Sequence, residues 1–217
     1  MRGERLRRVD EKRYDCLVIG GGPAGLGAAL YLARFHLGLE VVDAGKGRAS
    51  LIPCTRNHAG FPDGISGQEL IDRMKAQAQK YGASIETGRV TRLEKTEDGF
   101  EVEWGEGSVT ARSVLLATGL ANRRPPMEEA LHDEALANGL IRYCPICDGY
   151  EVTDKRVGVI GNDSHGVGEA IFLRGYTDDI TLIAPDKATD LRQQDWERLG
   201  DLGIPAGDGP CQAEPMR

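Results

Sequence analysis

The amino-acid sequence predicts an α/β fold made of two doubly wound units, and three observations support this expectation. Two segments, beginning at residues 14 and 157, each combine a short apolar run, a glycine-containing loop and a helical pattern of apolar residues. Between them, residues 99–104 alternate apolar and acidic side chains, as an antiparallel strand with one buried face does. We therefore expect a Rossmann-like unit with a β-meander, followed by a partial second nucleotide-binding unit.

The first unit is expected to open with a βαβ arrangement. The apolar run over residues 14–19 predicts a buried strand, and residues 25–35 place apolar side chains at helical spacing. A second apolar run, over residues 39–42, predicts a parallel strand that ends at Asp43. Residues 44–66 contain many glycines and prolines and predict a loop.

The meander is expected after a second helix. The apolar spacing that follows Gly67 predicts an amphipathic helix. Three strands should come next, over residues 89–94, 99–104 and 107–113. A separate buried strand over residues 114–116 should then return to the parallel sheet.

The second unit is expected to be short. A linker with a helix around residues 127–138 leads to a strand, a helix and a second strand, and residues 203–217 carry no strand signal. The residues after Gly161 suffice for about two βα units, whereas a mononucleotide-binding half has three strands. We place the two domains at residues 14–122 and 123–217, after a basic tail at residues 1–13 that we expect to be disordered.

Composition narrows the classes of function. The chain has 217 residues and a net charge of -7, without a sustained stripe of Lys and Arg, which argues against nucleic acid as the main partner. No apolar run is long enough to predict a membrane-spanning helix. The five cysteines do not suggest a disulfide scaffold, so we expect a reducing, cytoplasmic compartment.

A glycine motif predicts a dinucleotide site in the first unit. Gly20, Gly22 and Gly25 form the GxGxxG spacing between the first strand and the first helix. The first glycine permits the tight turn, the second lets the backbone approach a pyrophosphate, and the third lets helix and strand pack closely. Asp43 follows at the distance at which a carboxylate can bind ribose hydroxyls.

Cys144 and Cys147 form the second candidate site. Two cysteines separated by two residues can form a disulfide and exchange electrons, or they can supply half of a zinc site. A second CxxC or a histidine pair at ligand spacing is missing, so we favour redox chemistry and expect no metal. Asp148 could relay a proton beside the dithiol, or be a solvated loop residue. Cys16 is expected to be a core thiol, and Cys54 and Cys211 lie in predicted loops.

Four motifs occur together in one order: Gly20-Gly21-Gly22-Pro23-Ala24-Gly25, the segment 57–67, Ala117-Thr118-Gly119 and Cys144-Pro145-Ile146-Cys147-Asp148-Gly149. In this combination, residues 14 to about 183 resemble the low-molecular-weight thioredoxin reductases. The resemblance implies a Rossmann-like FAD-binding domain, a CxxC carried on the second domain, a thioredoxin-like protein or small disulfide as substrate, and a homodimer.

The resemblance also implies roles for individual residues. Cys147 would face the flavin, Cys144 would attack the substrate disulfide, and Asp148 would donate a proton. The FAD site would be formed by residues of the glycine loop and four other segments: Gly20, Gly22, Pro23, Ala24, Gly25, Asp43, Asn57, Val90, Ala117, Thr118 and Gly119.

The second glycine loop departs from this family. Asp163 stands where the middle glycine would be, and a carboxylate there would clash with and repel a pyrophosphate. Ala184-Pro185-Asp186 replaces the arginines that bind the 2′-phosphate of NADPH. Use of NADH or NADPH is therefore doubtful. Three alternatives stay open: weak NADH use, another donor such as ferredoxin, or a dithiol oxidase that uses oxygen.

The end of the chain is a second departure. A family member would return to the first domain and supply a Gly-Asp flavin contact after a buried strand, and Gly207-Asp208 lacks such a strand in our prediction. We therefore expect a C-terminally truncated chain. A catalytically incompetent dinucleotide-binding fragment or interaction module is the alternative to an enzyme.

The residue after the CxxC motif bears on the oxidase alternative. The known dithiol oxidases of this fold have a CxxC motif followed by His, whereas Asp148 in this chain favours a reductase.

Overall fold

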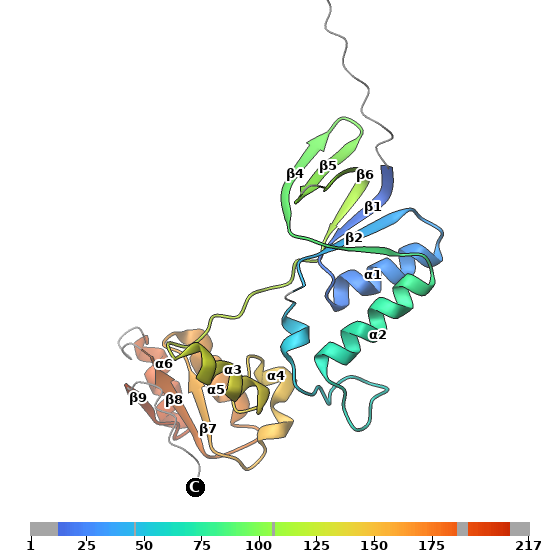
Figure 1. Ribbon diagram of the computed structural model, residues 1–217. Coiled ribbons are helices and arrows are strands. Elements are labelled where there is room, and N and C mark those ends of the chain that lie inside the picture. Colours follow the sequence, from blue (N-terminus) through green and yellow to red (C-terminus); the bar gives the residue numbers. More distant parts are fainter. Residues whose placement is uncertain (1–12, 46, 106, 186–190, 209–217) are drawn as a thin grey trace, which may run out of the picture. The chain divides into compact units, whose positions relative to one another are not determined.

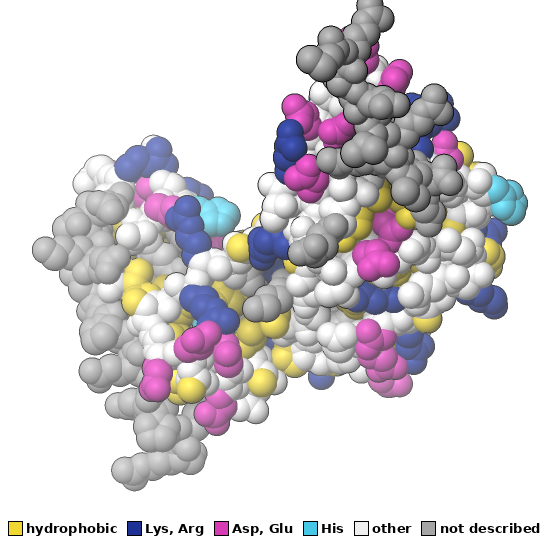
Figure 2. Space-filling view, turned by 45° about the horizontal axis from the view of Figure 1, so that its top comes forward, with side chains coloured by type: hydrophobic (Ala, Val, Ile, Leu, Met, Phe, Trp, Pro, Cys, Tyr) yellow, Lys and Arg dark blue, Asp and Glu magenta, His cyan; other side chains and the backbone are white. Residues whose placement is uncertain are grey.

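The computed structural model describes residues 13–208, except residues 46, 106 and 186–190. It consists of two compact units, Met1–Ala121 and Asn122–Arg217. Nearly all of the predicted tail, and also Cys211, Asp186 and the end of the chain, lie outside the described residues. Within the described part, no helix is long and apolar enough to cross a bilayer. Acidic and basic side chains are interspersed on the face shown in Figure 2.

The first unit is a six-stranded mixed sheet with the order β3-β2-β1-β6-β5-β4. Its parallel part contains β1 (Arg13–Ile19), β2 (Leu39–Asp43), β3 (Ser84–Thr87) and β6 (Gly107–Leu116). The antiparallel part continues from β6 through β5 (Gly99–Trp104) to β4 (Val90–Thr96). These strands and the helices α1 (Pro23–Arg34) and α2 (Gly67–Lys80), both labelled in Figure 1, confirm the predicted fold class of this unit. A short 3₁₀ helix, η1 (Arg48–Leu51), lies in the segment predicted as a loop.

Strand β1 is apolar from Cys16 to Ile19, where both of its faces are covered. Cys16 and Val18 pack with Ala29 and Ala33 of α1. Leu17, on the opposite face, packs in a cluster that includes residues of β5 and β6. The apolar run that predicted a buried strand has a direct cause, because successive side chains point to opposite faces of the sheet and both faces are covered.

Strand β6 corrects two expectations. The predicted strands at 107–113 and 114–116 are one ten-residue strand, which pairs antiparallel with β5 over Gly107–Ala111 and parallel with β1 over Thr110–Leu116. The expectation that residues 114–116 are buried is also wrong, because Leu115 and Leu116 are 38% and 64% exposed. One strand serves both the meander and the parallel sheet, which a search for separate apolar runs does not reveal. Strand β3 was likewise not predicted.

The second unit contains a three-stranded parallel sheet with the order β7-β8-β9. Its elements are α3 (Glu129–Ala137), α4 (Pro145–Asp148), η2 (Tyr150–Val152), β7 (Val157–Ile160), α5 (Ser164–Leu173), β8 (Ile180–Ala184), α6 (Gln193–Asp201) and β9 (Ala206–Asp208). The core joins Val167 and Leu173 of α5 to Leu182 of β8 and Leu199 of α6.

Strand β9 shows that the expectation of no strand after residue 203 is wrong. Ile204 is buried against the core of the unit, and the N–H of Leu182 donates to the Pro205 carbonyl at 2.9 Å. The strand that follows pairs in parallel with β8. The strand is too short for a periodic pattern, and a single buried isoleucine anchors it. Helix α6 was also missed, although its Leu199 is almost fully buried.

Candidate functional site: two glycine loops and a disulfide

The first glycine loop joins β1 to α1, and its glycines have different physical roles. At Gly20, φ is +113° and an added Cβ would lie 2.3 Å from the Ala117 carbonyl oxygen. At Gly25, a Cβ would lie 1.9 Å from the Gly20 carbonyl oxygen. A Cβ at Gly22 would meet no atom of the chain within 4 Å. Gly20 and Gly25 therefore shape the loop, while Gly22 leaves its backbone open to a ligand.

The segment that follows β6 lies beside this loop. The N–H of Ala117 donates to the Ile19 carbonyl at 2.8 Å. Gly119 has a φ of +66°, which glycine adopts without strain. Pro23 and Ala24 form the first turn of α1. The structure thus brings the predicted residues of two separate motifs together at the carboxyl ends of β1 and β6.

Asp43 ends β2 at the same edge of the sheet. Its Oδ1 accepts the N–H of Gly45 at 3.2 Å, and the Nζ of Lys75 lies 3.4 Å from its Oδ2. An added Cβ at Gly21 would lie 2.5 Å from the Asp43 Cγ. Sequence reasoning missed both Lys75 and the need for glycine at position 21. The run of three glycines was the available signal for Gly21.

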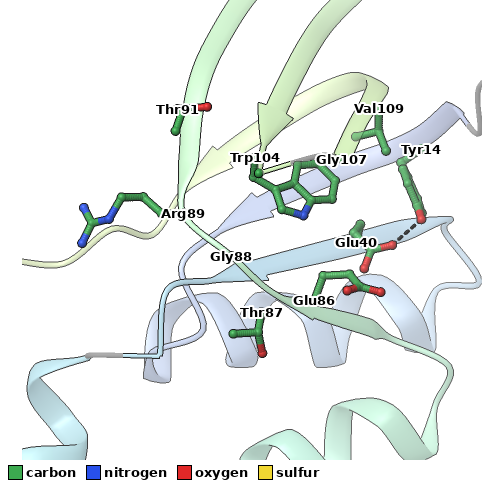
Figure 3. A pocket seen from close by; sticks show the side chains of 11 residues that line it. Tyr14, Glu40, Glu86, Thr87, Gly88, Arg89, Thr91, Trp104, Gly107 and Val109 are labelled. Atoms are coloured by element: carbon green, nitrogen blue, oxygen red, sulfur yellow. Dashed lines mark hydrogen bonds between the residues drawn. The ribbon is translucent and has the colours of Figure 1, made fainter.

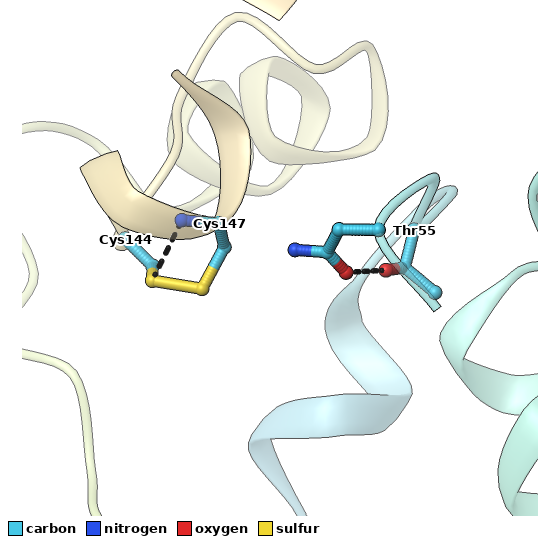
Figure 4. Close-up of a disulfide and its surroundings, with 4 residues drawn as sticks. Thr55, Cys144 and Cys147 are labelled. Carbon is cyan, nitrogen blue, oxygen red and sulfur yellow. Dashed lines mark hydrogen bonds between the residues drawn. A yellow bond between two sulfur atoms is a disulfide. The ribbon is translucent and has the colours of Figure 1, made fainter. Parts of the chain in front are cut away.

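Two further predicted residues lie in other segments of the first unit. Asn57 follows η1, and its Oδ1 accepts the hydroxyl of Thr55 at 2.7 Å (Figure 4). Val90 begins β4, two residues after Gly88, whose N–H donates to the Asp43 carbonyl at 2.9 Å. The start of β4 is therefore tied to the strand end that carries Asp43.

The CxxC motif forms a disulfide at the start of α4 in the second unit. The two sulfurs are bonded at 2.04 Å, and the N–H of Cys147 also donates to the Cys144 Sγ at 3.2 Å (Figure 4). Cys147 is exposed, and Cys144 and Asp148 are half-buried. Pro145 begins the helix, as proline favours. An added Cβ at Gly149 would lie 2.7 Å from the Tyr176 ring, so the turn after the motif requires glycine.

The second glycine loop joins β7 to α5 and is closed by its own side chain. Gly161 and Gly166 pack so closely that a Cβ on either would lie 2.9 Å from the Cα of the other. The Asp163 Oδ1 accepts the N–H groups of His165 and Gly166, both at 3.0 Å. These are donors of the kind that bind a phosphate at a helix N-terminus. The carboxylate of Asp163 therefore occupies the place of an anion.

A buried carboxylate supports the same helix end from α6. Asp195 is fully buried, and its Oδ2 accepts the hydroxyl of Ser164 at 2.7 Å and the Nε of Arg192 at 3.1 Å. These two interactions, the first above all, lower the pKa of Asp195 below its ordinary value of 3.8. The cluster fixes the first residue of α5 to α6 and so holds the second glycine loop in place.

Replacing Asp195 with asparagine should destabilise the protein at neutral pH. A carboxyl whose pKa is lowered by folding stabilises the folded state above its unfolded pKa, and this contribution is lost as the pH falls through the folded pKa. We expect Asp195→Asn to lower the urea midpoint of unfolding at pH 7, with a difference that narrows below about pH 4. Asp201→Asn, at the exposed end of α6, is the matched control. Equal midpoints for wild type and Asp195→Asn at pH 7 would contradict this role.

Comparison with known proteins shows which family contains these sites. The profile of the family described as pyridine nucleotide-disulphide oxidoreductase matches residues 14–197. Thioredoxin reductases of Treponema pallidum and Neurospora crassa are 38% and 37% identical over 175 and 186 residues. These matches cover 80% and 79% of this chain but 56% and 54% of the relatives. The chain thus spans about half the length of the curated relatives it matches.

Solved structures give the same result for the fold. The thioredoxin reductase of Streptococcus pyogenes superposes with a TM-score of 0.83 at 28% identity, over 94% of this chain and 68% of that one. The protein HlmI superposes with a TM-score of 0.78 at 31% identity, over 91% of this chain and 62% of that one.

Proposed function

The chain belongs to the pyridine nucleotide-disulphide oxidoreductase family, and from that premise we propose that it is a thioredoxin reductase-like, FAD-dependent disulfide oxidoreductase. The observation that carries the proposal is the Cys144–Cys147 disulfide, which is held at the start of a short helix with Cys147 exposed. A disulfide at an accessible helix start is suited to thiol–disulfide exchange. Relatives that are named thioredoxin reductase support the assignment.

The first glycine loop fits FAD. Its open backbone at Gly22 would accept the pyrophosphate, together with Gly20, Pro23, Ala24 and Gly25. Five further residues complete the proposed site: Asp43 for the ribose, then Asn57, Val90, Ala117, Thr118 and Gly119. FAD supplies two-electron redox chemistry when it is bound.

Cys144, Cys147 and Asp148 each have a proposed task. After two-electron reduction opens the disulfide to two thiols, the Cys144 thiolate attacks a sulfur of the substrate disulfide, and the other substrate sulfur leaves with a proton from Asp148. Cys147, the thiol assigned to the flavin side, then attacks the Cys144 sulfur of the mixed disulfide. The second substrate thiol is released and the Cys144–Cys147 disulfide forms again. The N–H of Cys147 that points at the Cys144 Sγ stabilises the attacking thiolate.

The substrate we propose is a thioredoxin-like protein or a small disulfide, reduced in the cytoplasm by a homodimer. The names of the relatives support a thioredoxin-like substrate. Asp148 follows the CxxC motif directly. In dithiol oxidases of this fold a histidine follows that motif, so Asp148 supports a reductase over an oxidase.

The second glycine loop fits a pyridine nucleotide poorly. Asp163 already accepts the two N–H groups that a pyrophosphate would need, and its charge would repel the phosphates. We therefore propose that this loop is not a tight NADPH site, and that electrons come from weakly bound NADH or from another reduced carrier such as ferredoxin.

Binding of FAD can be tested at Gly22 without disturbing the fold. An alanine methyl there would meet no atom of the chain but would intrude on a pyrophosphate, so Gly22→Ala should weaken FAD binding at least about tenfold, or about 1.4 kcal/mol. Gly27→Ala, inside the helix α1 that follows Gly22 and also with open space around its Cβ, is the matched control. Quenching of flavin fluorescence reports the affinity. A wild-type protein that takes up no added FAD would instead support a catalytically incompetent fragment.

A further inference from the structure

The first unit contains a cavity beside the start of β1. Its volume is about 690 Å³, and residues from β1 to β6 line it. Tyr14, at the beginning of β1, is part of the wall, whereas the glycine loop follows the other end of that strand. Six residues of extended chain separate the two places by about 20 Å. The end of the cavity at Tyr14 is therefore remote from the glycine loop, whereas Gly88, Arg89 and Thr91 at its other end border Val90 of the proposed flavin site.

Glu40 places a buried and incompletely hydrogen-bonded carboxylate in the wall of this cavity. Its side chain lines the cavity although the residue is only 4% exposed. The hydroxyl of Tyr14 donates to its Oε2, but its Oε1 is buried without a hydrogen-bond partner (Figure 3). A buried carboxylate oxygen without a partner is costly, so the position is better explained if a positive group binds there.

The surroundings of Glu40 select an organic cation. Glu86 adds a second carboxylate to the wall, and Trp104 adds an aromatic ring (Figure 3). The indole is confined by two glycines, since a Cβ at Gly88 or Gly107 would lie 2.5 or 3.0 Å from it. Arg89 also lines the cavity, but its guanidinium is directed away from this group in Figure 3.

We propose that the cavity binds an organic cation, an ammonium or guanidinium group that pairs with Glu40 and Glu86 and lies against the Trp104 ring. A carboxylate pair with an aromatic wall is suited to such groups, because the ring attracts a cation and the carboxylates accept its hydrogen bonds. A bare metal ion is a poorer fit, since the described residues contain no group of three His, Cys, Asp or Glu that could hold one.

Trp104 itself reports on the cavity. The chain has two tryptophans, Trp104 and Trp196, and the second lies on α6 of the other unit, so a Trp196→Phe background leaves one indole as reporter. Methylammonium chloride and methylguanidinium chloride are titrated separately at constant ionic strength, with sodium chloride as the blank. We expect a saturable change in fluorescence with at least one of them, and its chemistry distinguishes an ammonium from a guanidinium site.

Two charge variants separate specific binding from a general charge effect. Glu40→Gln keeps the shape of the side chain and should weaken binding at least tenfold, whereas Glu101→Gln removes the same charge from an exposed position on β5 and should leave binding unchanged. The cation should also raise the thermal midpoint of the parent protein but not that of Glu40→Gln. Fluorescence that follows only ionic strength, or identical titrations for the parent and Glu40→Gln, would overturn the proposal.

Discussion

Replacing Cys147 with serine should abolish electron transfer to a protein disulfide. A single thiol at Cys144 can form a mixed disulfide but cannot resolve it, so release of reduced substrate should fall by a factor on the order of 10³ or more. The measurement is a single-turnover assay, in which protein loaded with FAD and reduced anaerobically with dithionite is mixed with an oxidised thioredoxin-like protein and the free substrate thiols are counted.

A second observation in the same assay identifies the attacking sulfur. Cys147→Ser should accumulate a mixed disulfide through Cys144, and Cys144→Ser should accumulate none with the protein substrate. Cys54→Ser removes a free cysteine that is only partly exposed and should behave as wild type. Full release of substrate by Cys147→Ser would refute the assigned roles.

Replacing Asp163 with glycine should create affinity for a pyridine nucleotide. The change frees the N–H groups of His165 and Gly166 and removes a negative charge from the same place. We expect the dissociation constant of NADH or NADPH to fall at least about tenfold, at the cost of a few tenths of a kcal/mol in helix capping. Equilibrium dialysis measures this binding without any need for turnover.

The conservative variant separates the two causes of the effect. Asp163→Asn keeps a capping oxygen and removes only the charge, so its affinity should lie between those of wild type and Asp163→Gly. A wild-type protein that binds NADPH as tightly as Asp163→Gly would show that the second loop is not closed by its own aspartate.

Local motifs explain why much of the fold was predictable. The strand, glycine loop and helix that begin at residue 14 occur in one continuous segment, and each of the two elements has its own local pattern of apolar residues. Strand β9 and the length of β6 depend instead on pairing with strands that are distant in the sequence. Such pairing gives a three-residue strand no periodic signal, so the sequence alone could not reveal it.

In the candidate sites, too, local motifs were predictable from the sequence and contacts between distant elements were not. Glycine and cysteine spacing located the loops and the disulfide, because each motif is a few residues long. The contact of Gly21 with Asp43 and the pairing of Lys75 with that carboxylate join different elements, so they required the structure. At Asp163 the sequence predicted repulsion of phosphate, and the structure adds that its carboxylate caps α5.

An anaerobic electron titration tests most directly whether the flavin and the Cys144–Cys147 disulfide belong to one redox system. The protein is loaded with FAD and reduced stepwise with dithionite, while flavin absorbance and free thiols are recorded. Flavin and disulfide each take two electrons, so the wild type should consume about two two-electron equivalents per chain and Cys147→Ser about one. A wild-type protein whose flavin is fully reduced by one equivalent, with no new thiols at excess dithionite, would contradict the account.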